Sequence, residues 1–177
     1  MLLKFQLSMS NLRYPALIFF AVVALSFVLP VFYYSHLPET IASHYNINNE
    51  PDAWMSKQTS IIIHSAAMVF LTVMFFSIIY FVPKLPKRMI NLPNKDYWLN
   101  EENCTETFLI FRRFMFWLGS ITIGFLSLII QEVYNTNIAG KNKLSFVVWV
   151  YLAIMLTTIS FLTIKMILYF SKIDKHT

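Results

Sequence analysis

The run PALIFFAVVALSFVLPVFYY, Pro15–Tyr34, carries no charged side chain over its 20 residues. A helix that crosses a bilayer needs about 20 largely apolar residues, so this run predicts a transmembrane helix. It is long for the apolar part of a signal peptide, and no A-x-A cleavage site follows it, which favours an uncleaved anchor. Three further runs share its character and predict spans over residues 60–82, 108–130 and 144–170.

The composition supports the same class. Hydrophobic residues make up 57% of the chain, charged residues only 13%, and the mean hydropathy is +0.58, which is outside the range of soluble proteins. A membrane β-barrel would alternate apolar and polar residues in segments of about 10, whereas these runs are unbroken. The sequence therefore predicts an all-α membrane protein with four transmembrane helices, in which residues 1–177 form a single domain.

Basic residues set the expected orientation. Eleven of the 14 lie before the first run, in or beside the connection 83–107, or at the end of the last run. Cytoplasmic loops are enriched in Lys and Arg, so both termini and residues 83–107 are expected inside, and the loop 35–59 outside. Because this topology accounts for the basic excess, the expected partner is the lipid bilayer and no nucleic acid.

Polar and turn-forming residues are concentrated in the outer loop, LPETIASHYNINNEPDAWMSK, Leu37–Lys57. Residues 40–46 suit a short extended stretch. Asn48 and Asn49 favour a tight turn, because Asn tolerates the left-handed region. The loop is therefore expected to form a small, ordered, hairpin-like cap on the outer ends of the first two helices.

Two roles remain open for the polar residues of this cap. They can satisfy one another's hydrogen bonds and so structure the loop, which is the role we favour for most of them. They can also recognise a ligand outside the cell, such as a peptide or a lipid, because a mixture of aromatic and polar residues suits recognition. The candidate residues are His44, Asn46, Asp52, Trp54 and Lys57.

The same 21 residues resemble the pattern L-P-x-x-I-P-x-H-F-N-x-x-G-x-P-D-x-W-x-x-K. That pattern marks a bacterial membrane domain of unknown function, which forms the N-terminal part of the SdpI-type toxin-immunity proteins. Ala42 stands where the family prefers Pro, and Asn49 where it prefers Gly. The resemblance implies a place in the bacterial cytoplasmic membrane, and it supplies no catalytic residue. The matching positions are Leu37, Pro38, Ile41, His44, Asn46, Pro51, Asp52, Trp54 and Lys57.

The inner connection contains a second motif, NLPNKDYW, Asn91–Trp98. It is similar to the N-x-P-x-K-x-Y-W-L run of the short, stand-alone members of that family. Its adjacent aromatic residues favour an anchor at the membrane surface over a simple connector. Further along, Asn103 and Glu106 have the spacing of a capping box, with Asn103 as the N-cap. The candidate residues of the turn are Asn91, Pro93, Asn94, Tyr97 and Trp98.

The pattern of reactive residues favours binding over catalysis. The outer loop has ligand types that suit zinc, but no compact spacing such as HExxH, so no metal site or cofactor is predicted. No motif combines a nucleophile with a base and an orienting group. Near the span ends, His64 reads as a satisfied interfacial histidine more readily than as a proton relay.

Two functional classes follow from these residues. The favoured one is a binding, immunity or envelope-stress protein that uses its outer loop to recognise a ligand outside the cell. The alternative is a small transporter or membrane enzyme that uses His44 with Asp52, or His64 with Glu132. The sequence predicts no oligomeric state.

The orientation can be tested by cysteine labelling. Single cysteines at Asn49 and Asn137 are expected to react with a reagent that cannot cross the membrane, applied from outside, because both positions lie in predicted outer segments. The measurement compares the extent of labelling in intact cells with that in inverted vesicles. Reaction in inverted vesicles alone, at either position, would contradict the predicted orientation.

Overall fold

The structure is a computed structural model that describes residues 2–172 of the chain, with side chains from residue 12 onward. Two short 3-10 helices, η1 (Val82–Lys84) and η2 (Lys87–Met89), interrupt the inner connection. The remaining elements are α1 (Leu2–Tyr34), β1 (Thr40–Tyr45), β2 (Pro51–Ser56), α2 (Lys57–Phe81), α3 (Lys95–Trp98), α4 (Cys104–Ile138) and α5 (Val147–Ser171).

Four of the described helices are long and apolar enough to cross a membrane, as predicted. Their bounds differ from the expected spans: α1 begins at Leu2 instead of Pro15, and α4 continues to Ile138 instead of ending near residue 130. Packing explains the extension of α4, because Val133 and Tyr134 in these last turns are buried. Tertiary contacts of this kind keep a segment helical beyond its apolar run. The last span begins at Val147, slightly later than expected.

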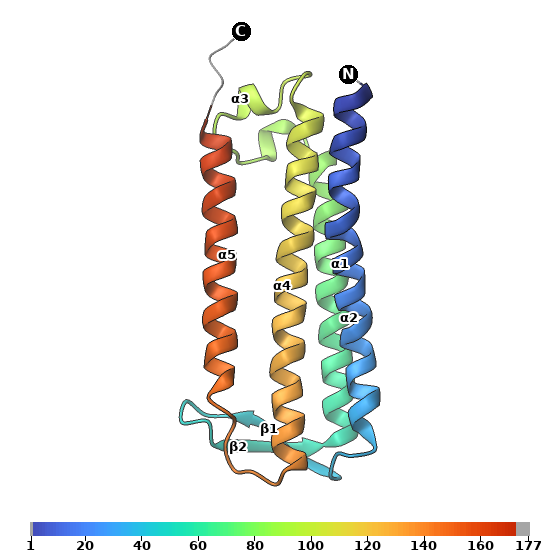
Figure 1. Cartoon of the computed structure of the whole chain (residues 1–177), viewed down its shortest axis with the longest axis vertical. Coiled ribbons are helices and arrows are strands. Elements are labelled where there is room, and N and C mark those ends of the chain that lie inside the picture. Colours follow the sequence, from blue (N-terminus) through green and yellow to red (C-terminus); the bar gives the residue numbers. More distant parts are fainter. Residues whose placement is uncertain (1, 173–177) are drawn as a thin grey trace.

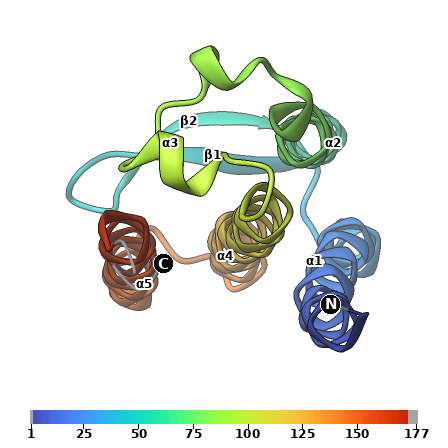
Figure 2. The ribbon, with the colours of Figure 1, turned by 90° about the horizontal axis from the view of Figure 1, so that it is seen from above.

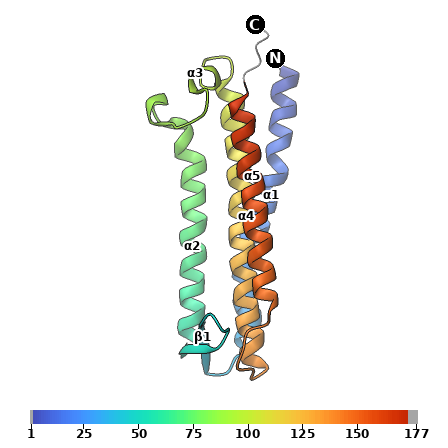
Figure 3. The same ribbon diagram turned by 90° about the vertical axis from the view of Figure 1, so that its left-hand side faces the viewer.

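The helices run along one common axis, and the small elements lie at its two ends (Figure 1). The beginning of α1, the end of α5 and α3 lie at one end, and β1 and β2 lie at the other. Seen along the axis, α4 lies between α5 on one side and α1 with α2 on the other (Figure 2). A side view also separates α2 from α5 (Figure 3). Which end faces the cytoplasm remains a prediction.

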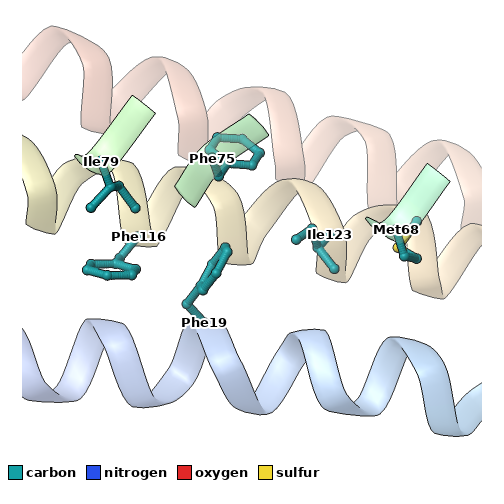
Figure 4. Packing of buried hydrophobic residues seen from close by; sticks show 6 residues of the cluster. All are labelled: Phe19, Met68, Phe75, Ile79, Phe116 and Ile123. Carbon is teal, nitrogen blue, oxygen red and sulfur yellow. The ribbon is translucent and has the colours of Figure 1, made fainter. Parts of the chain in front are cut away.

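The main core forms where α1, α2 and α4 meet (Figure 4). Gly119 of α4 allows this close approach, because a Cβ atom there would lie 2.7 Å from Cε2 of Phe19 and 3.1 Å from Cγ of Phe75. Small residues let membrane helices pack closely in this way. The buried residues of the core are Phe19, Met68, Phe75, Ile79, Phe116 and Ile123.

A polar contact between α1 and α2 compensates for a proline inside α1. Pro30 has no N–H, so the carbonyl of Ser26, four residues earlier, loses its usual helical partner. Nε2 of His64, a buried residue of α2, lies 3.1 Å from that carbonyl oxygen. A carbonyl only accepts hydrogen bonds, so Nε2 is the donor. This partner agrees with the interpretation of His64 as a satisfied histidine.

A double-mutant cycle tests this relationship. We expect His64→Leu to lower the free energy of unfolding by about 1–3 kcal/mol, because the buried carbonyl of Ser26 is left without a donor. In a Pro30→Ala background the loss should be smaller, since an alanine at this position supplies the missing N–H. Unfolding in detergent micelles gives the free energies of unfolding of the wild type, the two single variants and the double variant. Equal losses in both backgrounds would mean that His64 does not act through this carbonyl.

Candidate functional site

The outer loop folds as an antiparallel hairpin of β1 and β2, as the sequence suggested. Ala42 is opposite Trp54, and His44 is opposite Ala53, with irregularities in the register on both sides of His44. Such bulges insert an extra residue into one strand and bend it. The simple alternation of side chains is therefore interrupted at His44, within the motif.

Asn46 organises the turn that joins the strands. Its side-chain oxygen accepts hydrogen bonds from the backbone N–H groups of Asn48, at 2.9 Å, and Glu50, at 3.0 Å. Asn49 adopts a positive φ of 61°, in the left-handed region. This conformation suits Asn and Gly better than other residues, so Asn is a workable substitute where the resembled pattern has Gly.

Asn137, in the last turn of α4, fastens the hairpin to the helices. Its Oδ1 accepts from the N–H of Ala42 at 2.7 Å, and its Nδ2 donates to the carbonyl of Ala42 at 3.0 Å. One amide side chain thus pairs both backbone groups of Ala42, as a neighbouring strand would. The expected span ends near residue 130, so the sequence predicts a loop at Asn137 and does not indicate this role. Lys141, which is exposed, therefore serves the labelling test better.

A second cluster of apolar residues packs under the hairpin. Ile41 and Tyr134 are fully buried in it, and Leu37 and Val133 are nearly so. Burying an aliphatic side chain of this size stabilises a protein by about 1.5–3 kcal/mol when the side chain would otherwise contact water. The gain is smaller when the side chain would otherwise contact lipid. The hairpin is therefore packed on the ends of the helices.

Lys57 has a structural role at the base of the hairpin. Its Nζ lies 2.9 Å from Oε1 of Glu39 and 3.4 Å from the carbonyl oxygen of Leu37. It also lies 4.9 Å from the centre of the Tyr34 ring. The Lys57 side chain is only 13% exposed, so most of its surface contacts the protein, and a contact with a ligand stays a prediction.

The connection between α4 and α5 holds the tip of the hairpin. The N–H of Leu144 donates to the carbonyl of Asn49 at 3.1 Å, and Nζ of Lys143 lies 2.9 Å from Oε1 of Glu50. The hydrogen bond from Lys143, with its positive charge, lowers the pKa of the Glu50 carboxyl. The pair therefore stabilises the fold at a pH above the pKa that Glu50 has in the unfolded chain. This stabilisation is lost as the pH falls through the lowered pKa of Glu50 in the folded protein.

His44 and Asp52 form a hydrogen-bonded pair across the hairpin, through Nδ1 and Oδ1. The pair is open to solvent, with side chains that are 69% and 45% exposed. An exposed pair contributes about 0–1 kcal/mol, so its removal should cost less than that of a buried pair. Trp54 is also exposed, at 60%, and Ile47 at the turn is 84% exposed.

The outer edge of β2 has free backbone groups. Opposite residues in an antiparallel pair alternate between bonded and non-bonded positions. Both backbone groups of Ala42 bond to Asn137, so its opposite residue, Trp54, directs its N–H and C=O away from β1. No described residue outside the hairpin bonds to these two groups. The anchored hairpin therefore presents an unpaired strand edge beside an exposed tryptophan.

The inner turn, predicted as a surface anchor or a connector, caps the end of α5. Nε1 of Trp98 donates to the carbonyl of Phe170 at 2.8 Å, and Nδ2 of Asn94 donates to the carbonyls of Phe170 and Ser171 at 3.1 and 3.0 Å. The last carbonyls of a helix lack partners within it, so these side chains replace the missing donors. Asn91 and Pro93 are exposed. A contact of this turn with lipid stays a prediction.

The expected capping box at the start of α4 does not form as predicted. Asn103 precedes the helix, but its side chain makes no capping hydrogen bond. Its Nδ2 donates instead to the carbonyl of Tyr97 at 3.1 Å, and Thr107 Oγ1 donates to the carbonyl of Trp98 at 2.8 Å. These side chains bind the inner turn to α4, which a local pattern cannot indicate.

The other reactive residues do not converge. Within residues 12–172, no hydrogen bond or ion pair joins His64 to Glu132. No group of three His, Cys, Asp or Glu among the described residues could hold a metal ion. The arrangement at the hairpin is suited to binding through backbone groups, an aromatic ring and one exposed ionic pair.

The role of Asn137 gives a direct test. We expect Asn137→Ala to lower the free energy of unfolding by about 1–3 kcal/mol, because both backbone groups of the buried Ala42 lose their partner. Asn135 is exposed and lies on the same turn, so it is the matched control. Asn135→Ala should change the free energy of unfolding by less than about 0.5 kcal/mol. Thermal unfolding and hydrogen exchange of the hairpin amides give the readouts. Similar effects of the two variants would exclude the anchoring role.

Comparison with known proteins identifies one family in part of the chain. Residues 21–69 match the model of a family described as a domain of unknown function, DUF1648. The matched segment spans the last 14 residues of α1, the whole hairpin and the first half of α2. No curated protein and no solved structure matches the chain. The family match therefore places the hairpin, with the helices that flank it, inside a recurring segment, and the apolar helices are consistent with an integral membrane protein.

Proposed function

We propose that this chain is a multi-pass protein of the bacterial cytoplasmic membrane that binds an extended peptide outside the cell. In this proposal residues 1–177 form one domain with both termini in the cytoplasm. The outer edge of β2 is the binding element, and the biological role is immunity or a response to envelope stress. The protein acts by binding and not by catalysis.

One observation carries the proposal, namely the free backbone edge at Trp54 on a hairpin that is fixed to the helices. An extended peptide can add to such an edge as another strand, and its main-chain hydrogen bonds then supply affinity. Because the hairpin is held by Asn137 and by the Lys143–Glu50 pair, little ordering cost remains for the binding step.

The exposed side chains suit a peptide better than a lipid. Trp54 offers a large apolar surface at low cost in conformational entropy, which is why Trp is enriched at interfaces. The His44–Asp52 pair, beside it on the same hairpin, can bond to polar groups of a ligand. A lipid tail would need an apolar surface without directional backbone groups.

The resemblance of Leu37–Lys57 to the N-terminal part of SdpI-type proteins supports the role in immunity, and the Asn91–Trp98 run is similar to that of the short members of that group. The resemblance supplies no catalytic residue, so this support is by analogy with the family alone. Transport or catalysis by His44 with Asp52, or His64 with Glu132, is the competing class. The donation from His64 to the carbonyl of Ser26 speaks against a relay there.

Survival of a deletion strain under envelope-active peptides tests this function. We expect the wild-type gene to restore growth and Trp54→Ala to reduce protection at least tenfold, because the aromatic contact beside the free edge is lost. Trp149→Ala is the matched control, since Trp149 is an exposed tryptophan at the beginning of α5. In the purified protein, a bound peptide should slow hydrogen exchange at the amide of Trp54.

Two outcomes would contradict the proposal. One is equal survival of the deletion and wild-type strains with every peptide, and the other is an equal loss for both tryptophan variants. Loss of protection with Glu132→Ala, while Trp54→Ala keeps it, would favour the transport class.

A further inference from the structure

A cavity of about 340 Å³ lies at the α3 end of the molecule, away from the hairpin. Helices α2, α4 and α5 and the connection that follows α2 supply its walls. Its volume is within the usual range for small-molecule sites, about 300–1,000 Å³. The apolar side chains that line it include Ile78, Leu85, Met89, Phe111, Met115 and Met166.

The cavity opens to the surface and is not an enclosed void. Two of its lining residues, Leu85 and Met89, are 38% and 63% exposed. Its walls include α2 and α5, which do not form a packed pair, because α5 packs on α4 whereas α2 packs on α1 and α4. In the view along the axis, the connection after α2 extends across toward α5 (Figure 2). The connection therefore forms one wall of the cavity, and the cavity is open to the surface beside it.

Basic residues alternate with the lining residues along this connection. Lys84, Lys87 and Arg88 are exposed, whereas Val82, Leu85 and Met89 line the cavity. Lys84 lies over the ring of Tyr80, at 3.3 Å from its centre. Lys87 and Arg88 form no ion pair with any described residue. Two exposed cations without an ion pair thus directly precede Met89 of the apolar lining in the sequence, and we call this pair the rim of the cavity.

The position along the helix fixes the surroundings of this rim. The candidate span of α2 ends at Lys84. Lys87 and Arg88 follow three and four residues later, where the lipid headgroups are expected. Basic pockets between transmembrane helices bind anionic headgroups at this depth. A phospholipid has both parts that the site requires, an apolar chain for the cavity and a phosphate for the two cations.

We propose that the cavity between α2, α4 and α5 binds the acyl chain of an anionic phospholipid, whose phosphate contacts Lys87 and Arg88. The charge of the rim favours an anionic lipid over an apolar peptide, because an apolar peptide would not neutralise the two cations. The site is separate from the hairpin and does not depend on its function.

Lipid retention in native mass spectrometry tests this site. The protein is purified in detergent, mixed with phosphatidylglycerol or phosphatidylcholine, and the bound lipid is measured. We expect the wild type to prefer phosphatidylglycerol, and the double variant Lys87→Ser/Arg88→Ser to bind it about thirty-fold more weakly, since each cation near an anionic surface contributes about fivefold. The control Arg13→Ser/Lys141→Ser removes the same charge from exposed residues outside the cavity lining, and should keep the preference.

A separate variant tests whether the cavity binds the acyl chain. Met166→Trp fills the cavity and should reduce retention of phosphatidylglycerol, whereas Met155→Trp on the same helix lies outside the cavity lining and should not. Helicity and the melting temperature check that both variants fold. Equal retention of the two lipids by the wild type, equal losses in the charge variants, or displacement by inorganic phosphate alone would overturn the proposal. A dimer that excludes lipid would identify a second copy as the occupant instead.

Discussion

The membrane interior provides no water for backbone N–H and C=O groups, so each group has to find its partner within the protein. Helices meet this demand except where a proline interrupts the pattern, as at the carbonyl of Ser26 in α1, to which His64 of α2 donates. Side chains pair backbone groups in the same way at the edge of β1, where Asn137 bonds to Ala42, and at the end of α5, where Asn94 and Trp98 donate to Phe170. Among the described residues, the edge of β2 at Trp54 has no such partner. The three side-chain contacts also join segments distant in sequence.

Helix α4 is the element that most of these contacts share. It forms the core with α1 and α2, it fastens the hairpin at one end, and it holds the inner turn at the other. Helix α5 is attached differently, because Phe170 is its only buried residue within the described range. Its position therefore depends on contact along α4 and on the capping turn. This arrangement separates α5 from α2 and leaves room for the apolar cavity between them.

Sequence alone predicted the features that depend on local composition. The four apolar runs gave the helices, and Asn48 with Asn49 gave the turn, because these signals lie within a few residues. It failed where a distant partner decides the outcome. Residues 131–138 contain several polar side chains, so the end of α4 resembled a loop, yet packing under the hairpin keeps it helical. The roles of Asn137 and Trp98 depend on residues more than 70 positions away, and no spacing rule indicates them.

The attachment of the hairpin to Asn137 also has a consequence for the order of synthesis. Ala42 and Asn137 are 95 positions apart, so the hairpin is made long before the side chain that fastens it. At about 5–20 residues per second, the interval is roughly 5–20 s. During that time both edges of the hairpin are unpaired, and an unpaired edge is a template for association with other chains. The nascent protein is therefore most vulnerable to misassembly between the synthesis of the hairpin and that of the end of α4.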